Sequence, residues 1–128
     1  MAKLGLKPEA KEGGYYYGTF PETSLMALAG YVRHFVAIVR EKEGITAVFS
    51  EDVKENLHLY SQKKFEGPFC LITFSSMTSL NATGITAAAS SALAKEKISA
   101  NFLAGYFHDC VLVPYGMKEK ALKILAAL

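Results

Sequence analysis

The adjacent pair His108 and Asp109 has the clearest chemical potential in the sequence. It lies in "NFLAGYFHDCVLVP", residues 101–114, between two runs made mostly of apolar and aromatic residues. An imidazole beside a carboxylate could form a catalytic pair, hold a ligand or occupy a hairpin turn. Catalysis would need a nucleophile, and the nearest is Cys110, but successive strand residues point to opposite faces, so Asp109 and Cys110 should diverge. We therefore expect no catalytic residue here.

The second candidate is the helix start predicted at "TSLNATG", residues 78–84. Ser79 or Asn81 can cap this helix, and Gly84 carries no side chain that would block access to its first turn. The free amide groups of a helix start carry partial positive charge, so a carboxylate could dock there. In the alternative interpretation, Ser79 or Asn81 only caps the helix and Gly84 only permits close packing.

The two cysteines and three histidines do not form a metal-binding pattern. Cys70 and Cys110 lie in apolar, strand-like runs and match no spacing such as C-x-x-C. His34, His58 and His108 lack acidic or thiol partners at metal-ligand spacing. We expect buried, reduced thiols, no metal and no cofactor.

Size and charge narrow the choice of partners. The chain has 128 residues, 51% of them hydrophobic, which suffices for one ordinary domain or two small lobes. The net charge is +2, and no basic block is longer than Lys63-Lys64. We expect neither nucleic acid nor a membrane as a partner.

The start "MAKLGLKPEAKEGG" lacks the apolar segment of a secretion signal, and no stretch is apolar enough to span a membrane, so we expect a cytoplasmic protein.

Three successive tyrosines, residues 15–17, could suggest a platform for stacking nucleic-acid bases. No Arg or Lys interleaves with them, whereas such platforms pair aromatic rings with a cationic groove. We favour a strand that is half-buried against the core.

The C-terminal half has the clearer secondary-structure pattern. "FCLITFSS" is a near-continuous apolar run of strand length, and Met117, Ala121, Ile124, Leu125 and Leu128 recur at helical spacing. The "YFHD" segment between two β-type runs suits a hairpin turn that contains His108 and Asp109. The prediction is a strand at 69–76, a helix at 82–96, strands at 99–106 and 110–114, and a helix at 117–127.

The pattern of the N-terminal half predicts a second, incomplete set of strands and helices of similar length. We expect strands at 15–20 and 45–50, a helix with spacing through Val32, Phe35, Val36 and Val39 at 31–41, and a short helix at 52–57. The run "REKEG", residues 40–44, would be a solvated helix end with Gly44 as its C-cap. The halves would be structural cousins, at residues 1–64 and 65–128.

From Ser79 onward the sequence resembles the ACT domain, a ligand-sensing module with ferredoxin-like β-α-β-β-α-β topology. It is most similar to a stand-alone bacterial ACT-like family with the pattern S-L-x-A-x-G, a small-residue helix, I-x-x-N, and H-D-H before an apolar strand and Pro. The matching residues are Ser79, Leu80, Ala82, Gly84, Ile98, Asn101, His108, Asp109, Val113 and Pro114, and Cys110 replaces the second histidine. "YYYGTF" and "REKEGITAVF" extend the resemblance to most of the chain.

The resemblance implies an α+β protein of two ACT-like halves with antiparallel sheets. A strand from the other half or from a partner chain would fill the missing last position of the C-terminal sheet. It also implies a non-catalytic regulatory module that binds a small molecule, and we expect an amino acid. We further expect a homo-oligomer that associates through sheet edges. The alternative is a structural or adaptor protein that pairs with another protein without binding a ligand.

In ACT domains, amino acids bind between two modules, near the start of the first helix and the facing strand. Carried over to this chain, that implies Ser79, Asn81, Thr83 and Gly84, with Asn101, His108 and Asp109 as facing groups. The amino acid's carboxylate would meet the amides around Thr83 and Gly84, and Asp109 would accept from its ammonium group. This arrangement requires that Asp109 not lie exposed at the hairpin tip.

Overall fold

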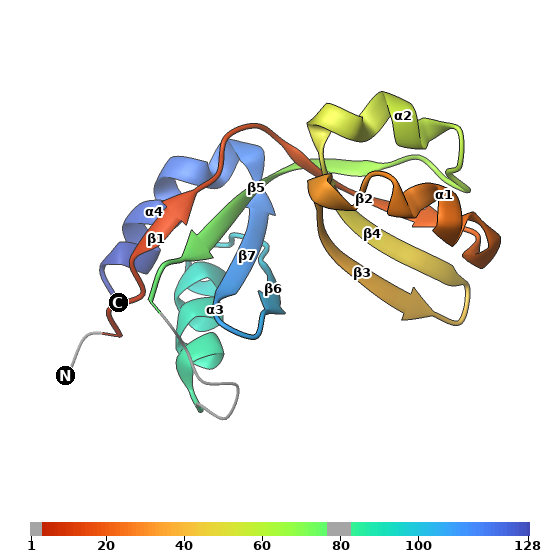
Figure 1. The fold of residues 1–128 in the computed structure, drawn as a ribbon. Coiled ribbons are helices and arrows are strands. Elements are labelled where there is room, and N and C mark those ends of the chain that lie inside the picture. Colours follow the sequence, from red (N-terminus) through yellow and green to blue (C-terminus); the bar gives the residue numbers. More distant parts are fainter. Residues whose placement is uncertain (1–3, 77–82) are drawn as a thin grey trace. The chain divides into compact units, whose positions relative to one another are not determined.

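The computed structural model describes residues 4–76 and 83–128, which form two compact units. One unit is Gly13–Pro68; the other combines the described residues of Met1–Glu12 with those of Phe69–Leu128. The boundary near residue 68 lies close to the expected one at 64/65, but residues 4–12 belong with the C-terminal unit. Figure 1 shows the elements of each unit.

The N-terminal unit, Gly13–Pro68, is an antiparallel sheet with two short helices. Its elements are β2 (Tyr15–Phe20), α1 (Leu25–Ala29), β3 (Phe35–Glu41), β4 (Gly44–Ser50) and α2 (Lys54–His58), followed by the first residues of β5 (Glu66–Phe74). The sheet order is β3-β4-β2-β5. This is a complete β-α-β-β-α-β unit, not the incomplete set expected, because α1 was not predicted and β5 supplies the last strand.

The core of the N-terminal unit is aromatic. Phe20 and Phe49 are fully buried, and their rings pack edge-on at 6.3 Å. Leu28 of α1 and Leu57 of α2 cover these rings on the helical side of the sheet. The three tyrosines of β2 are half-buried, as the strand interpretation required.

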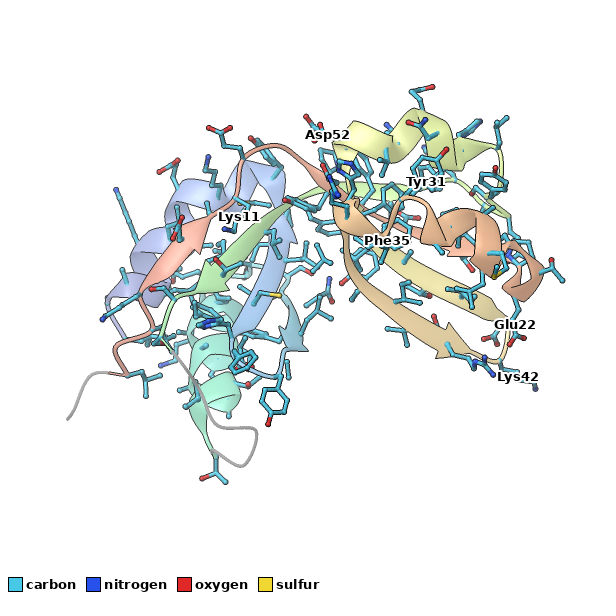
Figure 2. All side chains as sticks on the ribbon, in the orientation of Figure 1. Lys11, Glu22, Tyr31, Phe35, Lys42 and Asp52 are labelled. Carbon is cyan, nitrogen blue, oxygen red and sulfur yellow. The ribbon has the colours of Figure 1, made fainter. Side chains whose placement is uncertain are left out.

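Residues 35–41 form a strand, so the helix expected at 31–41 is wrong. Only the turn Val32–His34 before it is helical, and it is a 3-10 turn. β3 pairs with β4 through a tight hairpin whose turn carries Lys42 (Figure 2). The helical spacing arose by chance in a run rich in β-branched residues, which favour strands.

Gly44 begins β4 and is not the C-cap of a helix. Its φ of +148° is a backbone conformation for which only glycine is suited. A Cβ there would lie 2.6 Å from the carbonyl oxygen of Phe20. The glycine therefore allows the end of β2 to pass close to the hairpin.

The C-terminal unit is also a four-stranded antiparallel sheet with two helices. Its elements are β1 (Pro8–Ala10), β5 (Glu66–Phe74), α3 (Ile85–Lys95), β6 (Asn101–Ala104), β7 (Asp109–Pro114) and α4 (Lys118–Ala126). β5 pairs with β1 on one side and with β7 on the other, and β6 forms the opposite edge. A strand from the N-terminal part of the chain therefore occupies the missing last position of the sheet.

Both helices of the C-terminal unit cover one face of its sheet (Figure 1). Ala89 and Leu93 of α3 and Ala121 and Leu125 of α4 are buried. They pack against alternate residues of the central strands, namely Cys70, Ile72, Phe74, Val111 and Val113. The small residues of α3 predicted from the sequence thus serve this packing.

Candidate functional site

The start of α3 has no acidic side chain in its first turn and no side-chain cap among the described residues. Gly84 precedes the helix with a left-handed φ of +83°. A Cβ on Gly84 would meet nothing within 4 Å, and Thr83 and Gly84 are both exposed. Among the described residues, no side chain of residues 83 and 84 blocks the first amides of α3, and free amides of this kind can bind an anion. Ser79 and Asn81 lie outside the described residues.

The hairpin between β6 and β7 is closed by a turn over residues 105–108. The amide of Gly105 donates to the carbonyl oxygen of His108 at 3.0 Å. A Cβ on Gly105 would lie 2.6 Å from that same oxygen, so the turn depends on this glycine. Tyr106 and Phe107 form the tip and are 77% and 57% exposed.

His108 and Asp109 both lie at this hairpin but differ in their surroundings. His108 ends the turn, and its Nδ1 lies 3.3 Å from the carbonyl oxygen of Ser76, just beyond the end of β5. Asp109 is the first residue of β7, pairs with Ala104 and is half-buried. Asp109 is therefore not exposed at the tip, which meets the requirement set by the sequence analysis.

The pleat of the strands separates Asn101 from Asp109. Val111 packs in the helix-covered core, and since side chains alternate, Asp109 lies on that same face of β7. Asn101 pairs with Leu112, whose side chain points to the opposite face, and it is exposed. The start of α3 and the hairpin between β6 and β7 lie toward the same end of this unit (Figure 1). Asn101 lies on the opposite face of the sheet from Asp109.

The two cysteines are free, with Cys70 buried and Cys110 half-buried. Burial raises the pKa of both thiols, and for Cys110 the neighbouring Asp109 carboxylate adds to the effect and brings the pKa to about 11. A raised pKa disfavours the thiolate, which is the reactive form. Neither thiol is suited to act as a nucleophile near neutral pH.

These pKa values predict a loss of stability at alkaline pH. Between the ordinary thiol pKa of 9.0 and about 11, the unfolded chain loses the Cys110 proton while the folded chain keeps it. The stabilisation that the Cys110 thiol contributes to the folded chain is therefore fully present below pH 9.0 and is lost as the pH rises from 9.0 to about 11. Urea unfolding at several pH values should show the decline, and a Cys110→Ala variant should show less of it. An equal decline in that variant would contradict the assignment.

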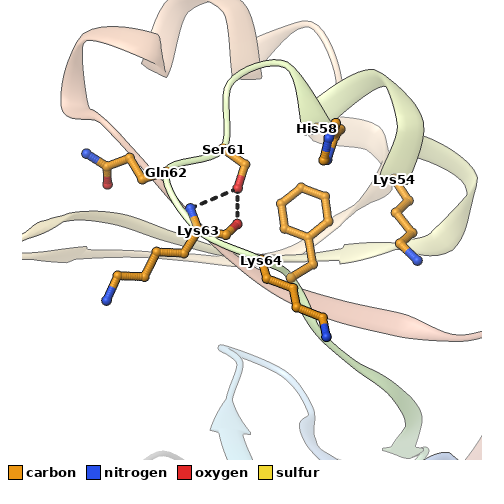
Figure 3. Close-up of a pocket in the computed structure, with 7 residues that line it drawn as sticks. Lys54, His58, Ser61, Gln62, Lys63 and Lys64 are labelled. Carbon is orange, nitrogen blue, oxygen red and sulfur yellow. Dashed lines mark hydrogen bonds between the residues drawn. The ribbon is translucent and has the colours of Figure 1, made fainter.

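The N-terminal unit contains a basic pocket that was not predicted from the sequence. A cavity of about 530 Å³ is lined by Lys54, His58, Ser61, Gln62, Lys63, Lys64 and Phe65 (Figure 3). The signal was the short distance along the chain between α2, which carries Lys54 and His58, and the Lys63-Lys64 pair.

Within residues 4–76 and 83–128, no group of three or more His, Cys, Asp or Glu side chains is placed to hold a metal ion. No helix in the same ranges is long and apolar enough to cross a membrane.

The fold defines the class of protein. The N-terminal unit has the ferredoxin-like β-α-β-β-α-β arrangement, and the C-terminal unit has β-α-β-β-α with β1 in the position of the last strand. Residues 68–127 match the family model of the ACT domain. The chain is 35% identical to VC0802 from Vibrio cholerae, described as a protein of unknown function and possible transport protein. The match covers 94% of this chain and 88% of that one, with a TM-score of 0.76. The chain therefore belongs to the ACT-domain family.

Two further solved structures share the fold at lower identity. The regulatory subunit of aspartate kinase from Thermus thermophilus superposes with a TM-score of 0.72 at 12% identity, covering 96% of each chain. The Atu0741 protein from Agrobacterium tumefaciens does so with a TM-score of 0.75 at 18% identity, covering 99% of this chain and 90% of that one. A comparison with curated proteins finds no match. The ACT-domain match at residues 68–127 and the shared fold support a regulatory ACT protein.

Proposed function

We propose that this ACT protein binds a free amino acid at the end of the C-terminal unit where α3 begins and β7 starts. The observation that carries the proposal is the pairing of opposite charges at that end. The start of α3 offers uncapped amides with no acidic residue in the first turn, and Asp109 offers a half-buried carboxylate. An α-amino acid has the complementary pair, a carboxylate beside an ammonium group.

In this proposal the amino acid's carboxylate accepts from the amides near Thr83 and Gly84, with Ser79 and Asn81 contributing from the preceding segment. Asp109 accepts from the ammonium group, and His108 is the second polar group of the hairpin. The helix start contributes about 0.3 to 1 kcal/mol to the binding free energy if it is exposed and about 2 kcal/mol if it is partly buried. A ligand with a millimolar dissociation constant has a binding free energy of about 4 kcal/mol, so the contact with Asp109 and side-chain packing must supply the rest.

The proposal includes self-association, in which two modules face one another across the ligand. Asn101 lies exposed on the opposite face and on the edge strand β6, so it would contribute from the facing module. Because β1 already completes the C-terminal sheet, self-association is not needed to fill a missing strand. We place this regulatory protein in the cytoplasm, with neither nucleic acid nor a membrane as its partner.

A thermal-shift screen against the common amino acids at millimolar concentration tests the proposal. A ligand present at a hundred times its dissociation constant adds about 2.7 kcal/mol to stability, which shifts the melting temperature by several degrees in a domain of this size. We expect a reproducible shift with one amino acid or a few related ones.

A flat response across the panel would contradict amino-acid binding and favour the adaptor function. A candidate surface for such an adaptor is formed by the exposed rings of Tyr106 and Phe107, which pack against each other at 4.8 Å. A protein partner lost in a Tyr106→Ser, Phe107→Ser variant would then identify that function.

A further inference from the structure

The basic pocket of the N-terminal unit has the size and form of a ligand site. Its volume of about 530 Å³ falls within the range of small-molecule pockets, about 300 to 1,000 Å³. It lies between α2 and the loop that leads into β5, both within the same unit (Figure 3). Phe65 gives it an apolar wall, since its ring is half-buried in the aromatic core against Phe49 at 4.9 Å.

The charges that line the pocket all have one sign. Three lysines, Lys54, Lys63 and Lys64, contribute to it, and no carboxylate does among the described lining residues. The ion pairs in the described part of the chain are Arg40 with Glu22 and Lys120 with Glu96, so none of the three ammonium groups is neutralised by an ion pair there. Lysines kept together without a counter-charge repel each other, and an anionic ligand would relieve that repulsion.

The nearest acidic group lies outside this pocket. Glu66 lines a smaller hollow of about 190 Å³, to which Lys63 and Lys64 also contribute. Lys63 extends to the side of the loop opposite Lys54 and Lys64 in Figure 3. We therefore assign the main anion contacts to Lys54 and Lys64 and not to Lys63.

The loop and the first of these lysines are held in place before any ligand binds. The amide of Lys63 donates to the Ser61 hydroxyl at 3.2 Å, and that hydroxyl donates to the Lys63 carbonyl. The amide of Gln62 donates to the carbonyl of Thr19 at 3.0 Å, which attaches the loop to β2. The ammonium group of Lys54 lies 4.4 Å from the ring centre of Tyr16, a cation–π contact.

We propose that this pocket binds the phosphate group of a small phosphate monoester, with Lys54 and Lys64 on the phosphate and the Phe65 ring against the organic part. Lysine binds phosphate as a point charge. His58 packs edge-on against Phe65 at 6.2 Å and offers a ring N–H at the same wall. A phosphate monoester, with about two negative charges at neutral pH, fits unneutralised lysines better than a singly charged carboxylate.

This site is independent of the proposed amino-acid site, because it is built wholly from residues 54–65 of the other unit. It would give the protein a second ligand of different chemistry. Either site can therefore fail its test without affecting the other.

An NMR titration of the ¹⁵N-labelled full chain with adenosine 5′-monophosphate tests the proposal, with adenosine and inorganic phosphate as comparisons. We expect saturable shifts of amides in residues 54–65, and binding of adenosine at least about tenfold weaker because it lacks the phosphate. Inorganic phosphate should shift the same amides more weakly, since it does not contact the Phe65 ring. The affinity should fall as salt is raised, since partly exposed charges are screened.

The variant to compare is Lys54→Met with Lys64→Ala, which keeps most of the Lys54 stem over Tyr16. We expect its affinity for adenosine 5′-monophosphate to fall at least about tenfold. Its matched control is Lys95→Ala with Lys123→Ala, which removes the same charge from two exposed lysines of α3 and α4. The control should bind within about twofold of the unmodified chain, since its lysines lie outside the pocket. Lys64→Ala alone, at an exposed position, keeps the test valid if the double variant does not fold.

Three results would overturn the proposal. The first is the absence of shifts in residues 54–65 at millimolar adenosine 5′-monophosphate. The second is an equal loss of affinity in the control variant, which would indicate a general charge effect. The third is equal binding of adenosine, which would show that the phosphate is not recognised.

Discussion

Replacing Gly44 with alanine should lower the free energy of unfolding by about 3 kcal/mol or more. The backbone there has a φ of +148°, a region that costs a residue with a side chain about 1 to 3 kcal/mol. The new Cβ would also lie 2.6 Å from the Phe20 carbonyl oxygen, so β2 or the β3–β4 hairpin would have to move. Because Phe20 is fully buried, such a movement would disturb the core of the N-terminal unit. Urea unfolding of the variant and the unmodified chain measures the effect.

Gly116→Ala is the matched control for this prediction. A Cβ at Gly116 would meet nothing within 4 Å, so its stability should stay within about 0.5 kcal/mol of the unmodified chain. If Gly44→Ala were as harmless as this control, the hairpin assignment at residues 35–50 would be contradicted. If Gly44 were the C-cap of a helix, as the sequence pattern suggested, the substitution would cost only the left-handed conformation, about 1 to 2 kcal/mol.

Replacing Asp109 with asparagine should weaken the amino acid's binding by about 2 kcal/mol, roughly thirtyfold. The amide side chain keeps the size of the carboxylate but removes the charge that accepts from the ligand's ammonium group. The folded chain itself should change by no more than about 0.5 kcal/mol, because no ion pair or side-chain hydrogen bond of Asp109 is found among the described residues. Calorimetric titration with the amino acid identified by the screen measures the affinity.

The control for this variant is Asp52→Asn. Asp52 is the other aspartate of the chain, is exposed and lies in the N-terminal unit, where its backbone amide donates to Ser50. The substitution removes the same charge without touching the proposed site. Equal weakening by both variants would indicate a general charge effect and contradict the role given to Asp109.

The secondary structure of the C-terminal unit could be predicted from the sequence because its helices and strands pack against one hydrophobic core. The near-continuous apolar runs of β5 and β7 and the helical spacing in α4 all reflect burial, which is visible in the order of residues. The edge strand β3 has no such face, since residues 38–41 are exposed, so chance spacing suggested a helix. β1 has three residues, which are too few to show the hydrophobic period of a strand, so it was not predicted.

The candidate site could be predicted only in part, for a similar reason. The half-buried position of Asp109 follows from the hairpin register, in which Asp109 is the first residue of β7 and pairs with Ala104. The sequence prediction that placed Asp109 in the turn was therefore wrong. The separation of Asn101 from Asp109 depends on which strand residues face the helices, and that requires the pairing of β6 with β7 to be known. The basic pocket requires α2 and the loop before β5 to come together, and no local pattern reveals such a contact.

The most direct test of the central claim is calorimetric titration of three proteins with the amino acid selected by the screen: the unmodified chain, Asp109→Asn and Asp52→Asn. The proposal predicts saturable binding by the unmodified chain and by Asp52→Asn with similar dissociation constants, and binding about thirtyfold weaker by Asp109→Asn. Unchanged binding by Asp109→Asn would contradict the claim that this carboxylate holds the ligand's ammonium group.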